Sequence, residues 1–122
     1  MPRPSPELAV VLASLVCRVP GVLAALLLDG HGVRLAQSQG DSSVLEAGTD
    51  RFMTLLRRFQ DAALRLQHGP VREVVIEAER RTLALIPLRH GCCLMLLMRP
   101  GGPVGQALFE ARKATGALNR VL

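Results

Sequence analysis

The chain has 122 residues and a formal net charge of +5, and although 49% of the residues are hydrophobic, only 2% are aromatic. A chain of this length suits a single domain over residues 1–122 with a core of ordinary size. The core is expected to be aliphatic, because Trp and Tyr are absent. The charge is spread along the sequence and flat rings for stacking bases are scarce, so both features disfavour a nucleic-acid partner.

The first predicted element is a helix that begins at Ser5-Pro6-Glu7. A serine cap, a proline at the first helical position and an acid in the first turn are typical of a helix start. An apolar face follows, made of Leu8, Val11, Leu12, Leu15 and Val16. The run is too short to span a membrane, and no clean cleavage pattern of a signal peptide follows it. We therefore expect a packed helix and no membrane contact.

Two strands and a turn come next. Val22–Leu28 is apolar throughout, which is typical of a strand covered on both faces. The sequence from Asp29 to Gly32 predicts a tight turn. Val33–Gln37 returns with polar side chains and is predicted to be an edge strand.

The middle helix is predicted over Val44–Gln67. One broad arc of that helix is apolar. Its members are Val44, Leu45, Gly48, Phe52, Leu55, Leu56, Phe59, Ala62, Ala63 and Leu66, with Met53 and Leu64 beside it. The arc is wider than one contact with a sheet needs, so we expect a second contact, most simply with the same helix of another copy. Scattered exposed apolar residues, which are common on proteins, are the alternative explanation.

Three further strands and a final helix complete the prediction. Val71–Ala78 is half polar, whereas Leu83–Leu88 and Cys92–Met98 are apolar on both faces, and a helix is predicted over Val104–Val121. A polar but β-rich strand is typical of a sheet edge, which can serve as an assembly surface.

The resulting fold class is α/β, with the order α-β-β-α-β-β-β-α. Because the second and third strands have the character of edges, we expect a five-stranded antiparallel sheet in the spatial order 2-1-5-4-3. Strands that are apolar on both faces need helices on both faces of the sheet. The middle helix is predicted on one face and the two terminal helices on the other.

The three cysteines predict no metal site and no redox site. Cys92 and Cys93 are adjacent and poorly placed to bridge each other, and with Cys17 they follow neither a zinc-finger nor a Cys-x-x-Cys spacing. We expect buried free thiols and a reducing cytoplasm. No nucleophile with a partner base, phosphate loop or ligand cluster stands out, so the sequence predicts no enzyme and no cofactor.

Two segments resemble a known family. The amino-acid sequences of residues 21–36 and 71–88 resemble the Roadblock/LC7 family, and in particular its bacterial MglB-like members. The order of the predicted elements agrees with that family over Leu8 to Leu118. The resemblance implies a profilin-like sandwich that dimerises through its middle helices and third-strand edges. It also implies a role as regulator or scaffold of small Ras-like GTPases, without a catalytic motif shared by the family.

The interface and partner residues are predicted from these arguments together. For the dimer interface they are Phe52, Met53, Leu56, Phe59, Gln60, Leu64, Arg72, Val74 and Ile76. For partner binding they are Arg51, Arg58, Arg65, Arg80 and Arg81, chosen by expected exposure. A regulator can order the catalytic loop of a GTPase or donate an arginine to it.

The leading hypothesis is therefore a non-enzymatic homodimeric scaffold or activator that binds a small Ras-like GTPase. Two alternatives remain. One is a profilin-like sensory module with a small-ligand cavity lined by Ala24, Ala84 and Cys92. The other is a basic nucleic-acid binder, whose binding would depend steeply on salt.

Overall fold

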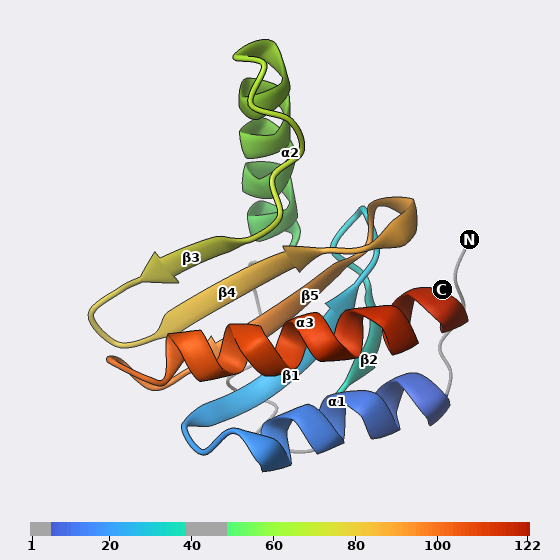
Figure 1. Cartoon of the computed structure of the whole chain (residues 1–122), viewed down its shortest axis with the longest axis vertical. Helices are drawn as coiled ribbons and strands as arrows, with labels where there is room; N and C mark the ends of the chain where they lie inside the picture. The colour runs from blue at the N-terminus through green and yellow to red at the C-terminus, as the bar shows by residue number, and fades with distance from the viewer. Residues whose placement is uncertain (1–5, 39–48) are drawn as a thin grey trace.

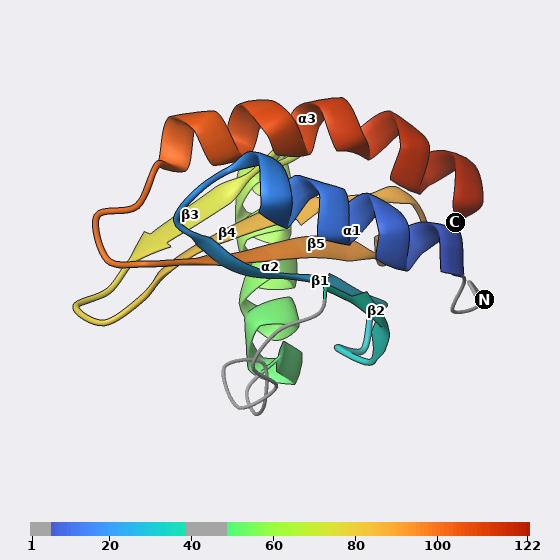
Figure 2. The same cartoon turned by 90° about the horizontal axis from the view of Figure 1, so that it is seen from below.

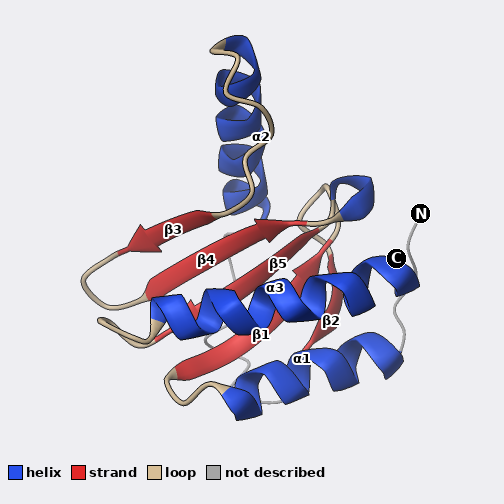
Figure 3. Cartoon of the chain, viewed as in Figure 1, coloured by secondary structure: helices blue, strands red, loops and turns tan. Residues whose placement is uncertain are grey.

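The computed structural model describes residues 6–38 and 49–122. These ranges form three α-helices and five strands (Figures 1 and 3). In chain order they are α1 (Pro6–Arg18), β1 (Val22–Leu28), β2 (Arg34–Gln37), α2 (Thr49–Arg65), β3 (Val74–Glu77), β4 (Thr82–Pro87), the 3₁₀ turn η2 (Arg89–Gly91), β5 (Cys93–Met98) and α3 (Val104–Val121).

The strands form one antiparallel sheet in the order β2-β1-β5-β4-β3, as predicted. The predicted bounds of β1 and α3 are confirmed, whereas the strand expected over Val71–Ala78 is shorter and is only Val74–Glu77. The part of the middle helix predicted over 44–48 lies outside the described residues. β2 and β3 are the edges of the sheet, so the polar character of both strands is explained.

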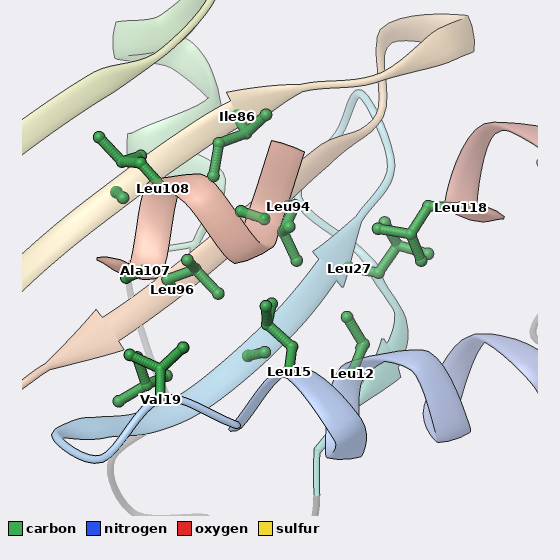
Figure 4. Packing of buried hydrophobic residues seen from close by; sticks show 14 of the residues in the cluster. Leu12, Leu15, Val19, Leu27, Ile86, Leu94, Leu96, Ala107, Leu108 and Leu118 are labelled. Atoms are coloured by element: carbon green, nitrogen blue, oxygen red, sulfur yellow. The ribbon is translucent and has the colours of Figure 1, made fainter. Parts of the chain in front are cut away.

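Helices cover both faces of the sheet, and alternate residues of the inner strands point to opposite faces. α1 and α3 pack side by side on one face, and α2 lies against the other (Figures 1 and 2). In β1, Leu27 faces α1 and α3, whereas Leu26 and Leu28 face α2. Figure 4 shows Leu12, Leu15, Leu27, Leu94, Leu96 and Leu118 together in the first of these clusters. The arrangement accounts for strands that are apolar on both faces.

The β1–β2 turn holds the start of α2 in place. The Asp29 carboxylate oxygen Oδ1 accepts hydrogen bonds from the backbone N–H groups of His31 (2.8 Å) and Val33 (3.0 Å). Gly32 has a φ of +86°, and a Cβ there would lie 2.7 Å from the Cα of Asp50. Glycine is therefore required, because both the positive φ and the close approach exclude a side chain.

The prediction of three buried thiols is confirmed for Cys92 and Cys93 and is wrong for Cys17, which is exposed. The physical reason is the helical repeat of α1. Leu8 and Leu12 face the sheet, and Cys17 lies on the side of the helix that is turned away from it.

Burial raises the pKa of the Cys93 thiol from its ordinary value of 9.0 to about 12, and the neighbouring Cys92 adds to the rise. Because the folded-state pKa is the higher one, the stabilisation is fully present below pH 9.0 and is lost as the pH rises towards the folded value. We expect the free energy of unfolding to fall by about 1.4 kcal/mol per pH unit in this window. Urea denaturation at several pH values measures this slope.

The Cys93→Ala variant should show a shallower alkaline slope, and the Cys17→Ala variant should keep the slope of the unmodified protein. An identical slope in Cys93→Ala would show that other groups cause the alkaline loss of stability.

Candidate functional site

α2 lies on the sheet with only part of its length. Met53 and Leu56 are 2% and 4% exposed and pack against the sheet. The helix then extends past β3 into open space (Figure 1). In this overhang Phe59, Leu64 and Leu66 are 46%, 58% and 65% exposed. An amphipathic helix normally buries its apolar stripe, so the face that carries Phe59 and Leu66 is an available contact surface.

The stripe has regular spacing; Phe52, its first member, is half-buried against the core, and the other four members are exposed. Phe52, Leu55, Phe59, Ala62 and Leu66 alternate steps of three and four residues, as the core positions of a coiled coil do. The backbone N–H of Leu66 donates to the carbonyl of Ala62 (3.0 Å), so helical hydrogen bonding continues to the last of them. We name these five residues the α2 seam. Leu55, Ala62 and Leu66 were absent from the predicted interface, although the three-four spacing in the sequence could have identified them.

Three of the predicted interface residues have roles within their own chain. Met53 and Leu56 pack between α2 and the sheet. The carboxamide of Gln60 binds the backbone of Val71, with Nε2 donating to the carbonyl (3.1 Å) and Oε1 accepting from the N–H (2.8 Å). Met53 and Leu56 therefore contribute to the core of their own chain, and the part of all three residues in a dimer interface stays a prediction.

β3 presents a backbone edge beside the overhang. Among the described strands it pairs only with β4. The N–H of Ala78 donates to the carbonyl of Arg81 (2.9 Å), and by the alternation of an antiparallel ladder the backbone groups of Val75 and Glu77 then point away from β4. Val74 and Ile76 are half-buried against the core on the α2 face. The edge thus offers unpaired backbone groups with apolar side chains next to them.

The segment that leads into β3 is held from both faces of the sheet. On the α2 face Gln60 binds Val71, as described above. On the other face Glu73 forms an ion pair with Arg112 of α3, in which Arg112 Nε lies 3.3 Å from Glu73 Oε2. The hydrogen bond from Arg112, and then the charge of Glu73, raise the pKa of the guanidinium. Arg72 is exposed between the two anchors. The β3 edge is consequently pre-ordered.

The five predicted partner-binding arginines are all exposed but lie in two places. Arg51, Arg58 and Arg65 follow one line along α2 beside the seam. The β3–β4 turn that carries Arg80 and Arg81 lies apart from α2 (Figures 1 and 2). Arg65 Nε lies 3.0 Å from Asp61 Oδ2, so this arginine already has an ion-pair partner. The structure therefore brings together only the α2 group.

The small-ligand cavity predicted between Ala24, Ala84 and Cys92 is not formed. All three residues are buried, but Ala24 faces α2, whereas Ala84 and Cys92 face α1 and α3. The sheet separates them, because neighbouring residues of a strand alternate between its faces. A cavity lined by all three residues is thereby excluded.

Over residues 6–38 and 49–122, no group of three or more His, Cys, Asp or Glu side chains gathers in a way that could hold a metal ion. None of the helices in these ranges is both long and apolar enough to cross a membrane.

Comparison with known proteins identifies the architecture. The family model of the Roadblock/LC7 domain matches residues 8–98. The Roadblock/LC7 domain structure from Streptomyces avermitilis has a TM-score of 0.81 at 22% identity and covers 92% of this chain and 94% of its own. MglB of Myxococcus xanthus has a TM-score of 0.83 at 12% identity, covering 94% and 86%.

A profilin is also similar. Profilin IA of Acanthamoeba castellanii has a TM-score of 0.58 at 16% identity and covers 91% of this chain and 95% of its own. The predicted profilin-like α/β fold is confirmed by this likeness. The search of curated proteins gives no match.

Proposed function

The chain belongs to the Roadblock/LC7 domain family, and on this basis we propose that it is a non-enzymatic regulatory scaffold that forms a homodimer and binds a small Ras-like GTPase. The observation that carries the proposal is the overhang of α2 beside the free edge of β3. The free cysteines Cys17, Cys92 and Cys93 fit a reducing cytoplasm as the place of action.

In the proposed dimer two β3 edges pair as antiparallel strands and the two α2 seams pack together. Leu55, Phe59 and Leu66 are 38%, 46% and 65% exposed, so completing their burial contributes about half of the roughly 1.5–3 kcal/mol that a fully exposed side chain gives. Association costs on the order of 4–15 kcal/mol in lost translation and rotation. The seam alone therefore barely offsets this cost, and the hydrogen bonds of the joined β3 edges are needed as well. Residues 71–73, which lead into β3, are already held by Gln60 and Arg112. Less conformational entropy is therefore lost when the edges pair.

Charge supports an acidic protein partner. The chain has 15 basic residues and 10 acidic ones. Within the described part of the chain, Arg51 and Arg58 have no ion-pair partner, and they flank the seam on α2. A basic row of this kind favours encounter with an acidic surface and suppresses other partners. These two arginines are the ones we assign to GTPase binding, and through them to a GTPase-activating role.

The test combines mass and binding. Light scattering at micromolar concentration should report twice the mass of one chain. A Ras-like GTPase from the same organism should be retained by the immobilised protein in one nucleotide state more strongly than in the other. Retention in neither state contradicts the GTPase partner, and a monomer contradicts the homodimer.

A charge-reversal pair of variants assigns the surface. Arg51→Glu with Arg58→Glu should weaken GTPase retention, whereas Arg80→Glu with Arg81→Glu, which makes the same change in charge on the β3–β4 turn, should leave it unchanged. Equal losses in the two double variants would show that net charge, and not the α2 row, determines binding.

A further inference from the structure

Figure 2 shows α1 and α3 side by side on the face of the sheet that α2 does not occupy. Side chains of these two helices line a groove. Its volume is about 360 Å³. The lining residues are Val10, Val11, Ser14, Leu15, Arg18, Glu110, Lys113, Ala114 and Ala117. The two helices are antiparallel, because Arg18 at the end of α1 lies near Glu110 in the first half of α3. The groove therefore has two chemically different ends.

The lining is small and apolar over most of its length. Ser14, Ala114 and Ala117 are short side chains, so the backbone of a ligand could approach α1 and α3 closely. At the rim Val10 is 67% exposed, and Phe109 on the neighbouring turn of α3 is 57% exposed. Val10 contributes little to the core of its own chain and is available for contact with a second molecule, whereas Lys113 Nζ already lies 5.2 Å from the centroid of the Phe109 ring.

One end of the groove carries an excess of positive charge. Arg18 Nη1 lies 3.8 Å from Glu110 Oε2, and Lys113 Nζ lies 3.5 Å from Glu110 Oε1. Glu110 is the single acid among the described residues that line the groove, so two cations share one carboxylate. A carboxylate brought in by a ligand would complete the neutralisation. The opposite end, at Val10 and Ala117, is apolar.

We propose that this groove binds a short amphipathic helix of a protein partner, with a carboxylate at the Arg18–Lys113 end and apolar side chains towards Val10. The lining residues of α1 run from Val10 to Arg18, which is roughly 12 Å or about two helical turns at 1.5 Å per residue. A helix of this length presents anchors at i, i+4 and i+7. The contact is small, so it is expected to be weak and reversible.

The groove and the dimer surface are separate. α2 and β3 carry the proposed self-association, whereas the groove lies on α1 and α3. Both sites can be occupied at once, and failure of the proposed dimer or of GTPase binding would leave the groove unaffected.

The probe is an alanine-rich helical peptide of about four turns with leucines at i and i+4 and a glutamate at i+7, so that the three anchors fit within the length of the groove. A matched peptide carries lysine in place of that glutamate. Titration into the isotope-labelled full chain should shift amide resonances of α1 and α3. The glutamate peptide should bind about tenfold more tightly than the lysine peptide.

Variants of the charged end complete the test. Lys113→Glu should reverse the preference between the two peptides, and Lys113→Gln should reduce it. Arg120→Glu makes an equal change in charge at an exposed position of the same helix outside the groove and should leave the preference intact. Resonance shifts on α2, equal affinity for the two peptides, or no shift at millimolar peptide would each overturn the proposal.

Discussion

Replacing Phe59 and Leu66 by aspartate is expected to convert the proposed dimer into a monomer that keeps its native fold. The two side chains are 46% and 65% exposed in the single chain, so their removal costs the isolated fold little. In the joined α2 seams they would be buried, and the aspartates would bring charges of like sign together. The loss of roughly 3 kcal/mol or more corresponds to at least about a hundredfold weaker association.

Light scattering measures the mass of this variant, and circular dichroism checks its helix content. Phe109→Asp is the matched control, because Phe109 is a similarly exposed aromatic residue on α3, far from the seam in the fold. The control should remain a dimer. A double variant that still has the mass of two chains would show that the α2 seam does not hold the copies together.

Replacing Met53 by alanine is expected to lower the free energy of unfolding by about 2–5 kcal/mol, the usual range for a fully buried methionine. Met53 is 2% exposed and packs with Leu56 against the sheet. Truncation leaves a cavity between α2 and the strands that the surrounding backbone can fill only in part. Leu64→Ala on the same helix should cost less than about 0.5 kcal/mol in the single chain, because Leu64 is 58% exposed.

Urea denaturation measures both variants, in the Phe59→Asp/Leu66→Asp background so that dissociation of a dimer does not contribute to the result. Similar small losses for Met53→Ala and Leu64→Ala would show that Met53 contributes little to the core of its own chain. A larger loss for Leu64→Ala would contradict the burial of both residues.

The sheet could be predicted because its strands carry strong local signals. The apolar run of β1 reveals both its bounds and its place inside the sheet, since only a covered strand tolerates apolar side chains on both faces. The polar residues of β2 and β3 identify the edges, and the order of the strands follows from them. The burial of Cys93 belongs to the same pattern, whereas the exposure of Cys17 depends on which side of α1 faces the sheet.

The candidate interface was predicted only in part. The sequence places Met53 and Leu64 beside the same apolar arc, yet the first is in the core and the second is exposed. The difference arises because the sheet ends at β3 while α2 continues. A helical pattern reports which residues share a face but not where the covering surface stops.

The amino-acid sequence alone predicts the element order, the edge strands and a helix with more apolar surface than one sheet contact needs, because each of these follows from the local spacing of apolar and polar residues. Three features emerge only from the packing of the folded chain: the part of α2 that overhangs the sheet, the contacts of Gln60 and Arg112 with the segment before β3, and the groove between α1 and α3. These features depend on contacts between residues far apart in the chain, and no local pattern encodes the distance between them.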